Sequence, residues 1–423
     1  MSGMRPISIA LVGIGGYGNS YVNLFLDAPA ETRASYELVA AIDPNFVASR
    51  RLDELKARGI AIFPSIEQFY ESHRADLAVL STPIALHAPQ AALACERGSH
   101  VLCEKPLCAT LEDAALMRDA RDRFNRHVAI GYQWSFSAAV QQLKADVLAG
   151  VYGRAKRLRT VVLWPRDEVY YARNRWAGAK RDAHGNWVWD SPVNNACAHY
   201  LHNMLYTIGP RIDRSAEPAR LTAELYRAHP IENYDTAALR ITTTDDVELL
   251  FVVSHATEGR VDPTFSYEFE RGTVEFAGSL DANITARMTD GTTREYGSPN
   301  DRKVGKLAMT VDAIRLGQPT VCGIEAAAAH TRCALAAQES MPDIVALPRD
   351  LVRIVGEVGH RKTWVEGLDD ALKRCYATWR LPGELGLPWG HAGNAVNVPR
   401  WIDPSISVRS TGFQPVHSRD STG

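Results

Sequence analysis

Short apolar segments alternate with amphipathic segments over the first third of the chain. Short, mostly apolar runs, which are candidates for buried strands, lie at 7–12, 36–42, 77–81, 100–103 and 128–132. Patterns with helical period lie between them, at 18–27, 47–58, 86–97 and 111–124. Gly98 lies where a glycine would end the third helix, and Thr110 with Asp113 resembles a capping box for the fourth. This alternation predicts a parallel sheet with helices on both faces.

The pattern changes near residue 150. Longer segments with partial alternation of polar and apolar residues occupy 154–163, 219–227, 236–242, 247–254, 265–270 and 273–276. Short turns separate several of them, which predicts an antiparallel sheet. Helical patterns return at 304–317, 323–340 and 368–378, so this region is expected to be α+β. Residues 404–423 are rich in Ser, Thr, Arg and Gly without any period, and we expect them to be disordered.

Composition and charge restrict the class of protein. With 423 residues, 46% of them hydrophobic, the chain should form about two or three globular domains. Lys and Arg (47) balance Asp and Glu (49), which disfavours nucleic acid as a partner. No apolar run approaches the roughly 18 residues that span a bilayer, and the first residues lack the features of a signal peptide, so we expect a cytoplasmic protein without a membrane partner. The seven cysteines include no C-x-x-C pair, which disfavours a disulfide framework or a zinc ribbon.

A glycine-rich loop follows the first predicted strand and opens the first predicted helix. Gly13-Ile14-Gly15-Gly16-Tyr17-Gly18 matches G-x-G-x-x-G in the context that makes this pattern informative. Gly13 would permit the tight turn, Gly15 would let a pyrophosphate approach the backbone, and Gly18 would let the helix pack on the strand. The loop therefore predicts a dinucleotide site; the alternative is a glycine-rich turn without a ligand.

Asp43 ends the second predicted strand. An acidic residue at this point accepts hydrogen bonds from a ribose 2′-hydroxyl and repels a 2′-phosphate, which favours NAD over NADP. Arg50 and Arg51 lie nearby in sequence and could bind a 2′-phosphate, so NADP remains an alternative cofactor. The alternative interpretation is that Asp43 is only a turn or helix-cap residue beside Pro44.

Three further motifs lie at the ends of later strands. Thr82-Pro83-Ile84-Ala85-Leu86-His87 follows the strand at 77–81, Glu104-Lys105-Pro106 follows 100–103, and Gly131-Tyr132-Gln133-Trp134 ends the next. The carboxyl edge of a doubly wound sheet is where ligands bind. Lys105 is therefore a candidate for chemistry; the alternatives are a surface lysine paired with Glu104 and, for His87, a helix-face histidine with a local hydrogen bond.

Together, the glycine loop, the T-P-x-x-x-H stretch and the E-K-P triplet resemble the glucose–fructose oxidoreductase / inositol dehydrogenase (Gfo/Idh/MocA) family over roughly residues 6–380. The resemblance implies an α/β protein with an N-terminal Rossmann domain (1–133), a doubly wound parallel sheet. It implies a C-terminal α+β domain with an open, mostly antiparallel sheet (134–380), which leaves an extension at 381–423. It also implies NAD(P) bound by Gly13, Ile14, Gly15, Gly16, Tyr17, Gly18, Asp43, Thr82, Pro83, His87, Glu104, Lys105 and Gln133. In such proteins the E-K-P lysine lies beside the nicotinamide and the substrate hydroxyl, and the Lys–Pro peptide is often cis.

A polar stripe follows the helix-start signal Asp190-Ser191-Pro192. Asn195, His199, His202 and Tyr206 recur at i, i+4, i+7 and i+11, which predicts one face of an otherwise apolar helix. These groups need partners or a polar cavity, and the alternative is a buried polar network at a domain or subunit contact. The family carries D-x-x-x-H-x-x-D here: His199 matches the His, whereas Asn195 and His202 stand where the two Asp are expected.

Asn in place of Asp at position 195 has a predicted consequence. Asn keeps the hydrogen bonding but removes a charge that would stabilise protonated Lys105 and His199, so both should behave as bases near pH 7. His199-x-x-His202 could share a metal, but no third ligand is evident beyond the unsupported His184 and Asp190. We expect no metal, and we assign catalysis to Lys105, His199 and Asn195.

An aromatic and basic stretch precedes this helix, at 170–176 and 187–189. Aromatic faces with Arg or Asn donors suit sugar rings, although the same residues could fill an interface. The candidate substrate-binding residues are Tyr132, Arg173, Trp176, Trp189 and His202.

The leading hypothesis is an NAD(P)-dependent oxidoreductase acting on a sugar, polyol or sugar derivative. The first alternative is a redox-neutral lyase or glycosidase that keeps NAD bound through a transient keto intermediate. The second is an inactive regulator that senses the dinucleotide, which the retained Lys105 and His199 disfavour. An open sheet face usually seeks a partner, so we expect a homo-oligomer.

Overall fold

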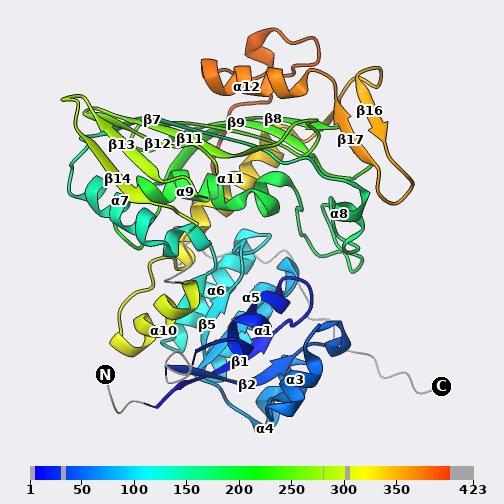
Figure 1. The fold of residues 1–423 in the computed structure, drawn as a ribbon, viewed down its shortest axis with the longest axis vertical. Coiled ribbons are helices and arrows are strands. Elements are labelled where there is room, and N and C mark those ends of the chain that lie inside the picture. The colour runs from blue at the N-terminus through cyan, green and yellow to red at the C-terminus, as the bar shows by residue number, and fades with distance from the viewer. Residues whose placement is uncertain (1–4, 30–34, 280, 301–304, 401–423) are drawn as a thin grey trace.

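The computed structural model describes residues 5–29, 35–279, 281–300 and 305–400. Within these ranges the strands form a six-stranded sheet, a ten-stranded sheet and a two-stranded hairpin. The first sheet and its helices, blue to cyan in Figure 1, lie below the larger green sheet, with a layer of helices between the two sheets. The predicted disorder at 404–423 concerns residues outside the described ranges.

The first sheet is parallel throughout, in the order β3-β2-β1-β4-β5-β6. The order reverses between β1 and β4, which is the doubly wound arrangement predicted from the sequence. Its strands are β1 (Ile7–Val12), β2 (Tyr36–Ile42), β3 (Ala61–Phe63), β4 (Leu77–Leu80), β5 (His100–Cys103) and β6 (Val128–Ile130). The apolar pattern does not predict β3, because three half-buried residues give no period.

The helices of this sheet are α1 (Gly18–Leu26), α3 (Leu52–Ala57), α4 (Ile66–Ser72), α5 (His87–Glu96) and α6 (Leu111–Arg123). The two predicted helix boundaries are confirmed: Gly98 has φ +92° just after α5, and Thr110 Oγ1 accepts the Asp113 amide at 3.1 Å. The single helix predicted at 47–58 is wrong, because a 3₁₀ turn (Phe46–Ala48) and α3 are separated there. The sequence reasoning also does not predict α4.

The second sheet is mostly antiparallel, as predicted, in the order β14-β13-β12-β11-β7-β10-β9-β8-β15, with β18 also on β8. The neighbours β7 and β10 are parallel. Its strands are β7 (Ala155–Leu163), β8 (Pro218–Arg227), β9 (Thr236–Thr243), β10 (Glu248–Ser254), β11 (Val261–Phe269), β12 (Gly272–Phe276), β13 (Ile284–Met288), β14 (Thr293–Gly297), β15 (Val345–Ala346) and β18 (Val396–Asn397). The hairpin is β16 (Val352–Val355) with β17 (Lys362–Val365).

The helices of the second region lie on both faces of this sheet. The face toward the first domain carries α7 (Ala138–Leu148), α9 (Ala198–Thr207) and α11 (Ile324–Ser340), and the opposite face carries α12 (Leu368–Thr378) (Figure 1). α8 (Glu168–Ala172) lies near the hairpin, and α10 (Lys306–Leu316) lies beside the first domain (Figure 1). The sequence pattern predicts α10, α11 and α12 but not α7.

The two sheets are joined through residues that are distant in sequence. The Ile130 amide at the end of β6 donates to the Cys322 carbonyl at 2.8 Å, and Ala129 forms a bridge with Gly323 just before α11. α10 contacts β5, and α11 contacts β6 and α6. The ends of β5 and β6 therefore face the second region directly.

The outer face of the larger sheet is covered in part by the chain itself. Val161, Leu163 and Leu250 form a buried cluster with Leu368 and Leu372 of α12. The rest of this face is polar: Arg157 pairs with Glu268 at 2.8 Å, and Glu275 and Arg287 are exposed. The apolar part of this face is thus already buried, and the homo-oligomer stays a prediction.

Replacing Leu372 by Ala should destabilise the protein by about 2–5 kcal/mol, because its side chain is fully buried and leaves a cavity. Urea denaturation measures the change. The matched control is Leu316→Ala in α10, where the leucine is 61% exposed and the change should stay within about 0.5 kcal/mol. Equal losses in both variants would mean that α12 is not packed on the sheet.

Candidate functional site

The glycine loop forms a tight turn between β1 and α1. Gly13 has φ +85°, and a Cβ there would lie 2.4 Å from the Ser81 carbonyl oxygen. A Cβ at Gly18 would lie 2.0 Å from the Gly13 carbonyl oxygen. Both positions therefore exclude a side chain, and the turn places the N-terminus of α1 at the carboxyl edge of the sheet, where a helix attracts an anion.

Asp43 lies against the same turn. Its Oδ2 accepts the Ile14 amide at 2.9 Å and the Gly15 amide at 3.3 Å, and its Oδ1 accepts the Asn45 amide at 2.8 Å. The carboxylate therefore fixes the loop from the end of β2.

The T-P-x-x-x-H and E-K-P motifs are tied together by a buried histidine. His87 Nδ1 lies 2.9 Å from the Pro106 carbonyl oxygen, and its Nε2 lies 3.0 Å from that of Thr82. Burial lowers the pKa of His87. Thr82 Oγ1 donates to Gln90, and the Lys105–Pro106 peptide is cis. His87 thus holds two loops at the sheet edge.

Glu104 is held by two residues that the sequence reasoning does not identify. The Tyr21 hydroxyl donates to Glu104 Oε1 at 2.7 Å, and Lys306 of α10 forms an ion pair with the same oxygen. Lys306 also lies 3.5 Å from the Tyr17 hydroxyl. A Cβ at Gly131 would come within 3.1 Å of the carboxylate. The negative charge of Glu104 is therefore paired inside the site.

The side chain of Lys105 contacts the second region. Its Nζ donates to both the backbone oxygen and Oδ1 of Asn195, each at 2.7 Å. Asn195 Nδ2 donates to Asp190 Oδ1 at 2.7 Å, and the Gly178 amide and Arg173 bind Asp190 Oδ2 at 2.6 and 3.1 Å. Asn195 thus separates the lysine from the buried carboxylate of Asp190, which the sequence analysis treats as part of a helix-start signal and as an unsupported metal ligand.

The predicted stripe lies on one helix only from His199 to Tyr206, because the helix is interrupted between Asn195 and α9. Ser191 caps a π-helical turn (Pro192–Ala196), and α9 begins only at Ala198. In a continuous helix the Asn195 carbonyl would accept the amide four residues on. Here this oxygen instead accepts the Cys197 amide and the Lys105 amine.

Burial shifts the titration of both candidate bases. It lowers the pKa of Lys105 to about 8, against the opposing charges of Glu104 and Asp190. Burial and the charge of Lys105 lower the pKa of His199, so its imidazole is neutral at pH 7. His199 Nδ1 is buried and has no hydrogen-bond partner in the described part of the chain.

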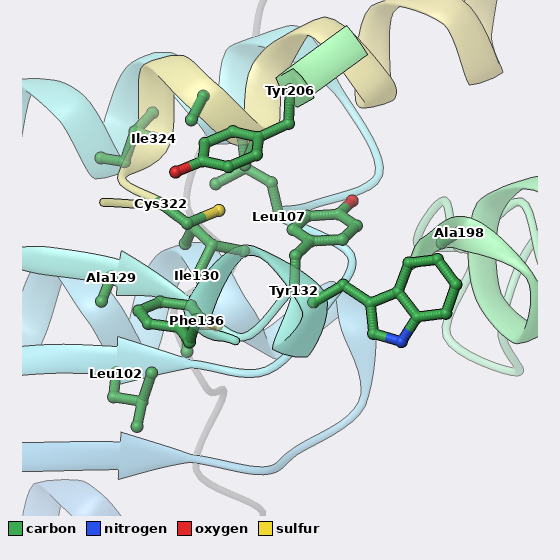
Figure 2. Close-up of a cluster of buried hydrophobic side chains, with 14 of the residues drawn as sticks. Leu102, Leu107, Ala129, Ile130, Tyr132, Phe136, Ala198, Tyr206, Cys322 and Ile324 are labelled. Carbon is green, nitrogen blue, oxygen red and sulfur yellow. The ribbon is translucent and has the colours of Figure 1, made fainter. Parts of the chain in front are cut away.

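Tyr132 and His202, two candidate substrate-binding residues, lie in the interior. Tyr132 stacks on His202 with ring centroids 3.9 Å apart, and its hydroxyl lies 2.8 Å from His330 Nδ1. His202 Nε2 lies 2.9 Å from Ser135 Oγ. Figure 2 shows Tyr132 inside a cluster of buried side chains from both regions, including Tyr206 of α9. This part of the stripe is a buried polar network, the alternative that the sequence left open.

The other three candidates lie on the segment before the helix. Arg173 pairs with Asp190, and its guanidinium carbon lies 3.8 Å from the centre of the Tyr170 ring. The centre of the Trp176 ring lies 5.6 Å from the same carbon. Trp189, with φ +47°, stacks on Trp187 at 4.2 Å.

A cavity of about 510 Å³ opens beside the glycine turn. Tyr17 and Gln133 are the candidate cofactor residues on its wall, and none of the five candidate substrate residues lines it. Its other walls are Ser20, Tyr21, Leu24, Trp134, Trp164, Tyr200, Arg260, Asp262, Pro263, Phe276, Gly278, Pro299, Asn300, Gly305, Lys306 and Leu307. The aromatic rings meet edge to face: Tyr200 lies 4.9 Å from Trp134 and 5.6 Å from Trp164.

The described residues contain neither a metal-binding cluster nor a membrane-spanning helix. No group of three or more His, Cys, Asp or Glu side chains there is arranged to hold a metal ion. No helix within those residues is long and apolar enough to cross a membrane.

The fold and the sheet-edge motifs define the first domain as a dinucleotide-binding Rossmann domain. Residues 7–132 match the family GFO_IDH_MocA, described as an oxidoreductase family with an NAD-binding Rossmann fold. This N-terminal part of the chain therefore matches the Gfo/Idh/MocA family, as the sequence motifs suggested.

Individual relatives match the same part of the chain. The rhizopine catabolism protein MocA of Rhizobium meliloti is 33% identical over 150 residues, which cover 36% of this chain and 45% of that protein. D-glucoside 3-dehydrogenase of Escherichia coli is 27% identical over 148 residues, 35% of this chain and 41% of that protein. The matched region thus spans less than half of these relatives.

The similarity of fold extends further. The WlbA dehydrogenase of Bordetella pertussis, solved with NADH and UDP-GlcNAcA, aligns with a TM-score of 0.64 over 79% of this chain and 97% of that chain, at 22% identity. The second region therefore shares its architecture with solved proteins of this kind.

The residues at the sheet edge fit a dinucleotide. The turn can form only because Gly13 and Gly18 lack a Cβ, and it directs the N-terminus of α1 to the sheet edge, where a pyrophosphate binds. The Asp43 carboxylate lies at the end of β2, where an acidic residue binds the ribose.

Replacing Gly18 by Ala should abolish NAD binding, because the new methyl would press on the Gly13 carbonyl and distort the turn. Calorimetric titration with NAD measures the loss. In the control Gly323→Ala, the nearest atom to the new Cβ would be 3.5 Å away, so affinity should be unchanged. Unaltered NAD affinity in Gly18→Ala would place the dinucleotide elsewhere.

Proposed function

We propose that this protein is an NAD-dependent dehydrogenase that oxidises a hydroxyl carbon of a sugar, polyol or sugar derivative. The proposal rests on the meeting of Lys105 and Asn195 at the carboxyl edge of the Rossmann sheet. Lys306 links Glu104, the neighbour of Lys105, to Tyr17 of the glycine turn. A nicotinamide dinucleotide bound at this edge supplies the acceptor for the hydride. The aromatic cavity beside it supports a sugar-like substrate.

Lys105 takes the proton of the substrate hydroxyl. Two acceptor oxygens at 2.7 Å fix the direction of its amine, and a pKa of about 8 gives it a neutral fraction near neutral pH. His199 stays neutral, so it assists Lys105 without adding charge beside the amine.

Asp190 is a positioning residue. By accepting Asn195 Nδ2, it orients the amide so that Oδ1 faces Lys105. Its own charge is balanced by Arg173 and the Gly178 amide. The site thus keeps a carboxylate near the lysine although position 195 is an amide.

The surroundings of Asp43 support NAD over NADP. Arg51, which could have bound a 2′-phosphate, is paired with Asp27 at 2.8 Å and with Glu54 at 2.6 Å. The carboxylate of Asp43 at the end of β2 would repel such a phosphate.

The purified protein should form NADH when it is given NAD and a suitable sugar from a panel, followed by absorbance. Lys105→Met should lower kcat by about 10²- to 10⁴-fold, because the base is lost. Lys373→Met, which changes a half-exposed lysine of α12, should not affect the rate.

The same assay separates the alternatives. Turnover without net NADH would replace the dehydrogenase by a redox-neutral lyase or glycosidase. NAD binding without turnover of any sugar would support the third hypothesis, a regulator that senses the dinucleotide.

The pH profile tests the role of the Lys105 environment. Oxidation requires neutral Lys105, so kcat/KM should rise with pH and level off above a midpoint near 8. Asn195→Asp adds negative charge beside the amine and should raise the midpoint by roughly one unit. Asp190→Asn removes a charge that stabilises the protonated amine and should lower it. A profile that neither variant moves would assign the titration to another group.

A further inference from the structure

Arg166 differs from the other cationic side chains around the site. Arg173 pairs with Asp190, Arg260 with Asp262 and Lys306 with Glu104. The guanidinium of Arg166 has no hydrogen bond and no carboxylate partner among the described residues, and its Nε is buried. A partly buried guanidinium whose N–H donors have no acceptor destabilises the fold unless a ligand or water accepts their hydrogen bonds.

Two aromatic rings fix the position of this guanidinium. Its central carbon lies 4.5 Å from the centre of the Tyr170 ring and 5.5 Å from that of Trp164. The backbone is also fixed, because the Arg166 amide donates to the His255 carbonyl at 3.0 Å. The donors are therefore preorganised, and a planar guanidinium matches a carboxylate or phosphate through two parallel hydrogen bonds.

Arg166 lines a second cavity, of about 170 Å³, with Pro165, Asp167, Tyr170 and Lys362. Lys362 of β17 has no ion pair within the described residues, and its backbone bridges Asp167. Asp167 uses its carboxylate to cap α8, through the Tyr170 amide at 3.0 Å. The cavity thus carries two cations against one engaged carboxylate, whereas the cations Arg260 and Lys306 of the larger cavity are paired.

A chain of contacts joins the second cavity to the proposed reacting centre. Tyr170 contacts Arg166 and also Arg173, which holds Asp190 behind Asn195 and Lys105. Trp164, the other ring against Arg166, lines the 510 Å³ cavity.

We propose that Arg166, assisted by Lys362, binds an anionic group of the substrate, a carboxylate or a phosphate, while the hydroxyl to be oxidised lies at Lys105. The preferred substrate is then an acidic sugar derivative rather than a neutral sugar. The part of this inference that places a reacting hydroxyl at Lys105 rests on the proposed dehydrogenase function. Anion binding at Arg166 can be tested without turnover.

The first experiment measures binding alone. Glucuronate and inorganic phosphate are titrated calorimetrically into the NAD-saturated protein and into Arg166→Met, which keeps the aliphatic stem against the rings but removes the charge. At least one probe should bind the unaltered protein, and its affinity should fall roughly ten- to a hundredfold in the variant. Arg154→Met, at an 89% exposed arginine near the start of β7, is the control and should bind normally. Failure of both probes to bind the unaltered protein, or equal binding by Arg166→Met, would overturn the anion site.

The second experiment compares glucose, glucuronate and glucose 6-phosphate as substrates. One acidic compound should have a kcat/KM at least about tenfold above that of glucose, and the better acid distinguishes a carboxylate from a phosphate. In Arg166→Met the advantage should disappear through KM, with kcat retained, and Lys362→Met should show a smaller loss. Equal loss for glucose and the acids would reduce Arg166 to a packing role. Probe binding that depends on Arg166 without NADH formation would refute the dehydrogenase but keep the anion site.

Discussion

The site depends on a contact between one amine and two oxygens across the domain boundary. Lys105, at the end of β5, donates to the backbone oxygen and to the side-chain oxygen of Asn195. A partly buried amine without hydrogen-bond acceptors would destabilise the folded state. Because its acceptors lie in the second region, the contact links the relative position of the two domains to the protonation of Lys105. The contact lies where the helix is interrupted between the π-helical turn and α9, and the Asn195 carbonyl accepts the Cys197 amide there as well.

The same interruption shows what sequence can and cannot predict. The glycine turn, the capping by Thr110 and the three strand-end motifs are local features, so their neighbours in sequence were sufficient to identify them. The stripe from Asn195 to Tyr206 assumed a constant period of 3.6 residues, and one irregular turn breaks this period between Asn195 and the three residues of α9.

The remaining site residues could not be predicted because their partners are distant in sequence. Lys306 reaches Glu104 across 202 positions, and no pattern in α10 distinguishes it from an exposed lysine. Asp190 is visible in the helix-start signal, but its role depends on the fold of the segment that contains Gly178 and Arg173. The partial cover of the outer sheet face by α12 is likewise a tertiary event, since the amphipathic pattern of α12 does not say which surface it covers.

Charge balance explains why Lys105 is suited to act as a base. Two carboxylates lie near the amine, and either could have kept it protonated. Glu104, however, is paired with Lys306, and Asp190 is paired with Arg173, so each carboxylate already has its own cation. Burial therefore outweighs attraction, and the pKa of Lys105 falls to about 8 instead of rising. Asn in place of Asp at position 195 is part of this balance, because a third carboxylate beside the amine would have raised the pKa of Lys105 again.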